Sequence, residues 1–266
     1  MTWLILAIFG GRIQHYASYP RRGVWNGMLT VKKTLSKNIQ APMVYRVLLP
    51  LLVRPLLKRG WSLENAYEFA RVGLLWVALL VTADYWGWQI TILWLLLAMS
   101  AQIYDTWCYT GEMIGITTAL MGNPYLAILG TIPHGMSRET VLINGFVYFL
   151  ATKDFAGAAV VQLCAFAVYL AVRSMQGEHK LYCNRWMIKE NIRQLTQKPV
   201  EPSIFHAPYM NLIIIVLALL GAFLMGDIGW TVPVLLAATL TMGKINEYRL
   251  QIPLMPFVAV ALIWLL

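Results

Sequence analysis

The chain has 266 residues, of which 59% are hydrophobic and 12% are charged, whereas a soluble domain carries about 25% charged residues. Its formal net charge is +9 and its mean hydropathy is +0.62. This composition excludes an ordinary water-soluble core. The sequence also contains no Gly-rich phosphate loop, no His/Cys metal cluster and no internal repeat.

Six apolar runs contain no Asp, Glu, Lys or Arg. They are Tyr85–Tyr104, Met113–Ser137, Phe155–Val172, Ala207–Gly226, Ile228–Gly243 and Leu250–Leu266. About 20 apolar residues in a helix cross a bilayer, and unbroken runs are typical of helices, because barrel strands alternate in hydrophobicity. We therefore predict an all-α, polytopic integral membrane helical bundle that forms a single membrane domain, residues 1–266.

The first part of the chain is strongly basic. Met1–Gly10 is apolar, and we expect a short first membrane segment or an interfacial helix there. Residues 12–60 contain ten Lys/Arg and no acid, which indicates a basic loop with one amphipathic helix. The prolines of Pro42–Leu57 interrupt helical hydrogen bonding and predict an interfacial or re-entrant segment. Arg46 and Arg54 would project about 80° apart on a helix, so both are expected to face one lipid head group.

Two helices are predicted next. Ser62 is placed to cap a helix that runs to about Ala83. Within this helix, Glu68 and Arg71 stand three residues apart and are expected to pair. A membrane span over Trp86–Tyr104 follows, with aromatic residues at both ends, as is typical of residues at the head-group level.

The run Met113–Pro133 is interrupted by Gly122-Asn123-Pro124, which is a turn signal. Each half has about ten residues, too few to cross a bilayer, so we expect two half-helices or a kinked span. If this segment enters and leaves on one face, both basic stretches of the chain lie on the same side of the membrane. After it, Ser137 is predicted to cap a helix over Arg138–Thr152.

The rest of the chain contains four more predicted spans and a polar, basic loop over residues 173–208. The loop is expected to hold a helix around Leu181–Leu195. The spans lie near Phe155–Val172, Tyr209–Gly226, Ile228–Met242 and Ile252–Leu266. The total is about seven transmembrane helices. Basic loops of this kind attract anionic lipids rather than nucleic acid, and we expect membrane lipids as partners in a bacterial inner membrane.

Charges near the ends of the apolar runs are the candidate functional residues, because charges at membrane depth are costly. The candidate catalytic bases are Asp105, Glu139 and Glu112. The candidate substrate-binding residues are Arg46, Arg54, Arg138, Glu247 and Arg249. Taken singly, each acid also fits a helix cap or an interfacial ion pair. Asp105 and Glu112 are two helical turns apart and could share a divalent metal such as Mg²⁺, but no metal site is assigned.

Four short motifs carry a resemblance: PMVYRVLLPLL, YDTW, SRETVL and NEYRLQIPLMPFV. In this layout the chain resembles GT-C-type polyprenyl-phosphate-dependent glycosyltransferases. The resemblance implies functional roles for Tyr45, Arg46, Pro50, Asp105, Arg138, Glu139, Thr140, Glu247 and Arg249. Three features depart from that family, whose members usually have a catalytic Asp in a large loop after the first span, more spans and a longer soluble part, so a minimal member and a non-catalytic relative both stay open. The segment Arg12–Ala41 contains no acid.

Three functions are therefore compared. A membrane enzyme acting on a lipid-linked sugar donor needs a carboxylate base and cationic groups that hold the phosphate. A non-enzymatic integral membrane subunit with protein partners would instead tolerate loss of those acids. A lipid or small-molecule transporter would use the broken segment at Gly122–Pro124, because discontinuous helices line transport sites.

Overall fold

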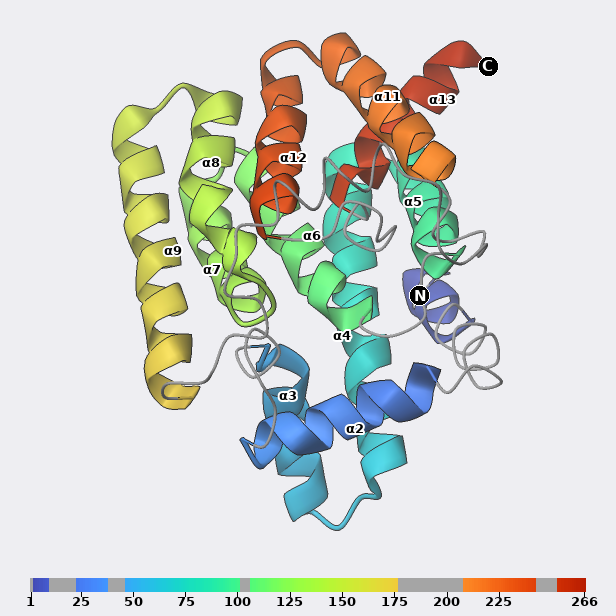
Figure 1. Cartoon of the computed structure of the whole chain (residues 1–266), viewed down its shortest axis with the longest axis vertical. Coiled ribbons are helices and arrows are strands. Elements are labelled where there is room, and N and C mark those ends of the chain that lie inside the picture. Colours follow the sequence, from blue (N-terminus) through green and yellow to red (C-terminus); the bar gives the residue numbers. More distant parts are fainter. Residues whose placement is uncertain (1, 10–22, 38–45, 101–105, 177–207, 243–252) are drawn as a thin grey trace. The chain divides into compact units, whose positions relative to one another are not determined.

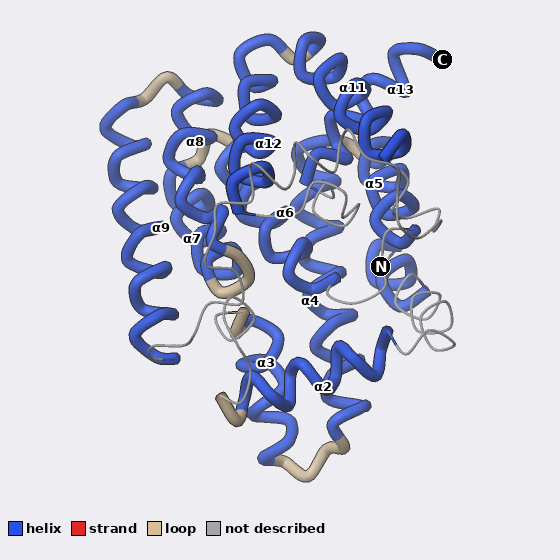
Figure 2. Tube along the Cα trace, viewed as in Figure 1, coloured by secondary structure: helices blue, strands red, loops and turns tan. Residues whose placement is uncertain are grey.

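The computed structural model describes residues 2–9, 23–37, 46–100, 106–176, 208–242 and 253–266. Every regular element in these ranges is a helix, which confirms the predicted all-α class (Figures 1 and 2). The chain divides into two compact units, each built from two stretches. The first unit comprises Met1–Tyr85 and Gln102–Tyr182, and the second comprises Trp86–Ala101 and Cys183–Leu266.

The first unit begins with a helix over residues 2–9. Its other described helices are α2 (Gly23–Leu35), α3 (Leu48–Lys58), α4 (Leu63–Trp86), α6 (Thr106–Leu120), α7 (Pro124–Gly135), η3 (Glu139–Ile143), α8 (Asn144–Thr152) and α9 (Phe155–Gln176). The second unit holds α5 (Trp88–Ser100), α11 (Pro208–Leu224), η5 (Gly226–Trp230), α12 (Thr231–Met242) and α13 (Met255–Leu265). In this unit α13 packs against both α5 and α11.

The start of α4 follows the sequence signals. The Ser62 hydroxyl accepts a hydrogen bond from the Asn65 backbone N–H at 3.2 Å, as an N-cap does. Arg71 Nη2 lies 2.6 Å from Glu68 Oε2, which confirms the predicted pair. The helix has 24 residues and continues to Trp86, three residues beyond the predicted end.

The predicted break in the second apolar run, at Gly122-Asn123-Pro124, is confirmed, and it separates α6 from α7. Gly122 has a φ of 72°, which a residue with a side chain adopts only with strain. The Asn123 side chain accepts hydrogen bonds from the backbone N–H groups of Tyr125 (3.0 Å) and Leu126 (3.2 Å). Because Pro124 suits the first turn of a helix, α7 begins directly after this cap.

Helices α6 and α7 then pack against each other with their backbones very close together. A methyl group built on Gly115 would lie 2.5 Å from His134 Cβ, and one on Gly111 would lie 2.6 Å from the Pro133 carbonyl oxygen. Glycine at these two positions is therefore what allows the helix backbones to approach so closely.

The predicted cap at Ser137 was wrong. Its hydroxyl donates a hydrogen bond of 2.6 Å back to the Pro133 carbonyl, which closes the end of α7 instead of starting the next helix. A serine hydroxyl can satisfy either a preceding carbonyl or a following N–H, and here the preceding carbonyl is satisfied. The predicted helix over Arg138–Thr152 consequently begins as the 3₁₀ turn η3 and becomes α-helical only at Asn144.

Two helices in the described residues are long and apolar enough to cross a membrane, by length and composition: Leu63–Trp86 and Phe155–Gln176. The second confirms the predicted apolar helix that starts at Phe155 and extends it past Val172. The other apolar helices of the described ranges are shorter, so the total of about seven spans stays a prediction.

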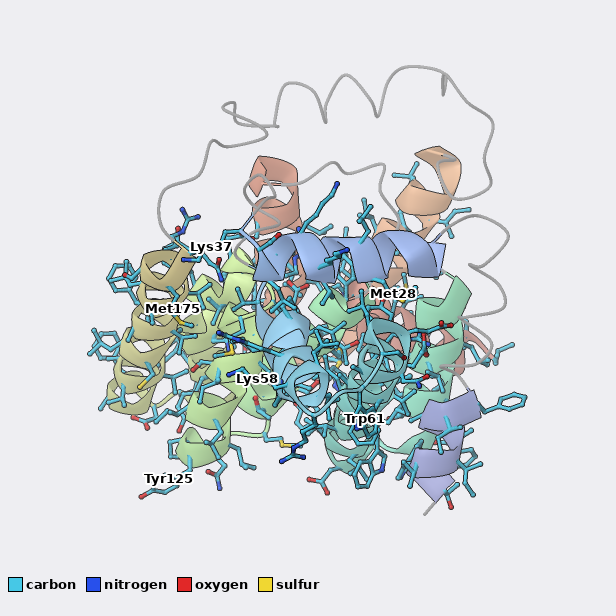
Figure 3. The ribbon with its side chains drawn as sticks, turned by 90° about the horizontal axis from the view of Figure 1, so that it is seen from below. Met28, Lys37, Lys58, Trp61, Tyr125 and Met175 are labelled. Atoms are coloured by element: carbon cyan, nitrogen blue, oxygen red, sulfur yellow. The ribbon has the colours of Figure 1, made fainter. Side chains whose placement is uncertain are left out.

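The basic N-terminal stretch forms α2 and α3 in its described part. Lys37 follows α2, and its Nζ donates a hydrogen bond of 2.8 Å to the Met175 carbonyl near the end of α9 (Figure 3). Just before α3, the Leu48 backbone N–H donates to the Met136 carbonyl at 3.0 Å. These bonds bring the basic stretch to the end of α9 and to the turn after α7. The predicted helix around Leu181–Leu195 lies outside the described residues.

Candidate functional site

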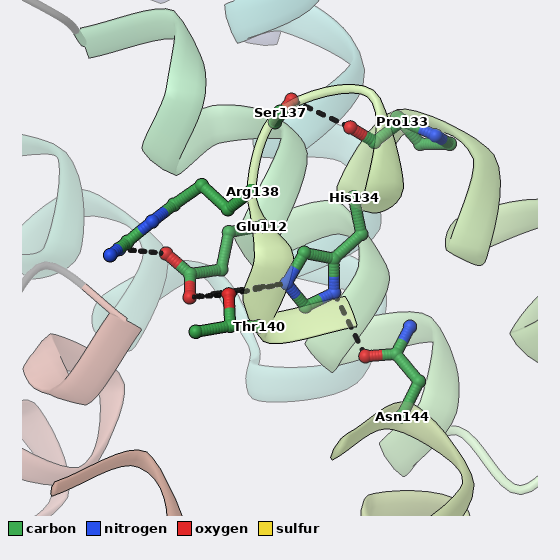
Figure 4. A network of polar contacts seen from close by, with 7 residues as sticks. All are labelled: Glu112, Pro133, His134, Ser137, Arg138, Thr140 and Asn144. Carbon is green, nitrogen blue, oxygen red and sulfur yellow. Dashed lines mark hydrogen bonds and ion pairs between the residues drawn. The ribbon is translucent and has the colours of Figure 1, made fainter. Parts of the chain in front are cut away.

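A chain of buried polar side chains links α6, α7, η3 and α8 in the first unit (Figure 4). Its members are Glu112, His134, Arg138, Thr140 and Asn144. Glu112 is 1% exposed, His134 and Asn144 are 0% exposed, and Arg138 is 8% exposed. Buried polar groups are costly unless they are hydrogen-bonded. The bonds within this network satisfy its side chains except at Arg138 Nε and Asn144 Nδ2, which have no partner among the described residues.

Both oxygens of the Glu112 carboxylate are occupied. Arg138 Nη1 lies 2.6 Å from Oε2, and the Thr140 hydroxyl lies 2.5 Å from Oε1. The Arg138 bond is an ion pair between two buried side chains. Charge-assisted bonds of this length are among the strongest that proteins make, so Glu112 is held at two points.

Counting protons fixes the direction of the remaining bonds. Thr140 has one hydroxyl proton and gives it to Glu112, so it accepts from His134 Nε2 at 2.9 Å. His134 Nδ1 lies 2.8 Å from Asn144 Oδ1. A neutral imidazole with its proton on Nε2 accepts at Nδ1, so this contact is a hydrogen bond when the Asn144 amide is turned to present Nδ2 to the ring.

Arg138 is held on a second side by an aromatic ring. Its guanidinium carbon lies 4.9 Å from the centre of the Tyr109 ring, at cation–π distance. Burial by itself would lower the pKa of Arg138, but the Glu112 carboxylate raises it above its ordinary value, so the side chain stays charged. Arg138 Nε is buried and has no hydrogen-bond partner in the described part of the chain.

Beside this chain lies a small, open depression near the C-terminal end of α9. It is lined by Arg46, Gly135, Ser137, Arg138, Glu139, Tyr169, Val172 and Arg173, and its inner volume is about 10 Å³. That volume is the room needed for about one water molecule or a single small polar atom group. The guanidinium of Arg173 stacks 4.6 Å from the centre of the Tyr169 ring. Three arginines from three separate segments thus meet beside one half-buried carboxylate, Glu139.

The structure brings together part of the predicted site. Arg46, Arg138 and Glu139 line the depression, whereas Glu112 does not line it and is bonded to Arg138. Arg54 is on the exposed side of α3 and does not line the depression. The candidates Asp105, Glu247 and Arg249 lie outside the described residues.

Sequence reasoning missed three residues of this region: His134, Asn144 and Arg173. A usable signal existed for His134, because a polar side chain inside an apolar run is expected to face protein rather than lipid. Arg173 was recognised only as part of a basic loop, whereas it belongs to the last turn of α9. Asn144 carried no pattern that separates it from any other polar residue of the predicted helix over Arg138–Thr152.

The depression has room for about one oxygen of a phosphate group, and its residues are of the types that bind phosphate oxygens and accept a proton. Planar guanidinium groups bind phosphate oxygens at two points, and a half-buried carboxylate next to them can act as a base. Within the described ranges, no group of three or more His, Cys, Asp or Glu side chains is placed to hold a metal ion. The pairing of Asp105 with Glu112 is not described, so the metal hypothesis stays a prediction.

Comparison with known proteins adds no assignment to this geometry. No protein-family model, no curated protein and no solved structure matches the chain.

Proposed function

We propose that this chain is an integral membrane protein of a bacterial inner membrane that acts as a glycosyltransferase-like enzyme on a lipid-linked sugar donor. It would have about seven membrane spans, with α4 and α9 among them. The observation that carries the proposal is the meeting of Arg46, Arg138 and Arg173 beside Glu139 at the end of α9.

The surface of α9 supports the membrane part of this proposal. Its outward side chains are large and apolar, and several are strongly exposed: Phe155, Val160, Leu163, Phe166 and Leu170. An exposed helix face made of these five large apolar side chains is unusual for a protein in water but normal for one in lipid. A lipid lying along α9 would place its head group near the arginines at the end of that helix.

The proposed reaction assigns one role to each kind of side chain. Glu139 takes the proton of the acceptor hydroxyl while that oxygen forms a bond to the sugar anomeric carbon. The bond from that carbon to the phosphate oxygen breaks, and the polyprenyl phosphate leaves with the electron pair. Arg46 and Arg138 stabilise the negative charge on the departing phosphate. Glycan or cell-envelope assembly is the process in which such a transfer takes place.

A binding experiment tests the proposal first. Native mass spectrometry of the detergent-solubilised protein would be used to titrate farnesyl phosphate, with uncharged farnesol as the control ligand. We expect farnesyl phosphate alone to bind, and Arg46→Gln to weaken it roughly tenfold, since a hydrogen bond to a charged group contributes about 1.5–3 kcal/mol. Arg54→Gln is the matched control, because Arg54 does not line the depression.

A second experiment separates an enzyme from a membrane subunit. The protein would be extracted gently from its own membrane, and the mass of the protein with any bound lipid or protein partner would be measured by native mass spectrometry. A retained glycolipid that releases its sugar with wild-type protein but not with Glu139→Gln supports the transferase. Finding a stoichiometric protein partner and no bound lipid would contradict the proposal and favour a non-enzymatic membrane subunit.

A further inference from the structure

We infer that Thr140, His134 and Asn144 form a positioning chain, which fixes Glu112 and, through Glu112, the guanidinium of Arg138 at the depression. Glu112 is then a positioning residue rather than the base. The inference rests on the proposed function for the identity of what Arg138 binds, but the chain itself stands on contacts within the first unit.

The first argument is that Glu112 has no capacity left for catalysis. Its two oxygens bond Arg138 Nη1 at 2.6 Å and the Thr140 hydroxyl at 2.5 Å, and the side chain is 1% exposed. A base must reach the proton that it removes, and Glu112 reaches only protein. By contrast, half-buried Glu139 lines the depression.

The second argument is that the Glu112–Arg138 ion pair does not itself require the hydrogen bonds that continue from Glu112 through Thr140 and His134. A buried pair can exist without a hydroxyl, an imidazole and an amide arranged behind it. Here Thr140 bonds both Glu112 and His134, and His134 bonds Asn144 in turn. Each hydrogen bond restricts the side-chain rotation of the residue that it holds. The Glu112 carboxylate is therefore kept in one orientation relative to Arg138.

The third argument is that the Arg138 guanidinium is held by protein groups but does not have all of its hydrogen bonds satisfied by them. Glu112 holds Nη1 and the Tyr109 ring covers the guanidinium, while Nε is buried with no partner among the residues that the structure describes. An unsatisfied buried donor is costly unless something completes it. Arg138 also lines the depression, so the guanidinium that Glu112 and Tyr109 hold is presented to the anion that binds there.

Three substitutions test the positioning chain without any ligand. Thr140→Val removes the hydroxyl and keeps the shape, and Thr140→Ser keeps the hydroxyl. Arg138→Lys retains the charge but loses the planar fork. We expect the double variant Thr140→Val/Arg138→Lys to lower Tm by less than the sum of the two single changes, because both act through Glu112. Thr140→Ser should restore the wild-type behaviour.

A matched control is available on α6. Thr118 is also buried, but its hydroxyl donates to carbonyls of its own helix, Ile114 at 2.8 Å and Gly115 at 3.0 Å. Thr118→Val should therefore combine additively with Arg138→Lys. If Thr140→Val is additive as well, no positioning chain exists and the inference is overturned, whatever the protein binds.

The second arm links the chain to the site. In the farnesyl phosphate titration, Thr140→Val should weaken binding about tenfold, while Thr140→Ser and Thr118→Val bind as wild type does. Equal affinity of wild type and Thr140→Val would overturn the inference. Coupling in Tm without any binding by wild type would instead uphold the chain within the fold and contradict the proposed function.

Discussion

Arg138 Nη1 lies 2.6 Å from Glu112 Oε2, although the two residues are 26 positions apart and belong to different elements. Both side chains are more than nine-tenths buried. Removing one partner from such a pair leaves an uncompensated charge away from water, and the loss is much larger than for a pair at the surface. This contact should therefore dominate the response of the fold to substitution.

Glu112→Gln is expected to destabilise the protein by about 3–5 kcal/mol, because Arg138 keeps its charge and loses its counter-ion. Reversible unfolding in mixed micelles would measure the change. Glu64→Gln is the control, because Glu64 is exposed in the first turn of α4 and its loss should cost less than about 1 kcal/mol. Equal effects of the two variants would show that the Glu112 pair contributes little.

Gly115→Ala is expected to lower the stability by about 1–3 kcal/mol, since the new methyl group would lie 2.5 Å from His134 Cβ. Gly73→Ala provides the contrast, because nothing lies within 4 Å of a methyl group at that position of α4. There the gain in helix propensity should stabilise the protein by about 0.5–1 kcal/mol. Opposite signs of the two Tm shifts would support the close packing of α6 on α7.

Thr117→Val should leave the stability unchanged or raise it by up to about 1 kcal/mol. The Thr117 hydroxyl is buried, and no partner for it exists within the described ranges. Replacing it by a methyl group of the same shape removes an unsatisfied polar atom. A clear drop in Tm would mean that this hydroxyl makes a bond that the structure does not show.

Spin labels on α9 test whether this helix faces lipid. With the native cysteines replaced, a label at Leu163→Cys should collide more with oxygen than with a polar nickel chelate, because Leu163 is 68% exposed on an apolar face. A label at Asp154→Cys, in the turn before α9, should show the reverse preference. A polar profile at Leu163 would contradict the membrane proposal.

Local signals were enough to predict several elements of the fold. The cap of α4 at Ser62 and the break at Asn123 depend on residues within three positions of each other, and both are present. Ser137 shows where such reasoning fails. Its hydroxyl had two local partners available, and the sequence alone does not determine which one it bonds.

The site was less predictable, because its bonds join distant positions. Thr140 and Glu112 are 28 residues apart, and they meet only because α7 folds back onto α6 at two glycines. No spacing rule connects residues across such a turn. Sequence reasoning could select Glu112, Arg138 and Glu139 as unusual charges, but it could not separate the carboxylate that is enclosed from the one that lines the depression.

The break at Asn123 also has a consequence for synthesis if α6 and α7 lie in a bilayer, as the proposed function holds. Helix α6 has 15 residues and α7 has 12, whereas about 20 are needed to cross the hydrocarbon. Under that proposal neither helix crosses the bilayer alone, so the two would enter it as a closed hairpin, and α6 would be placed only after translation had passed Gly135.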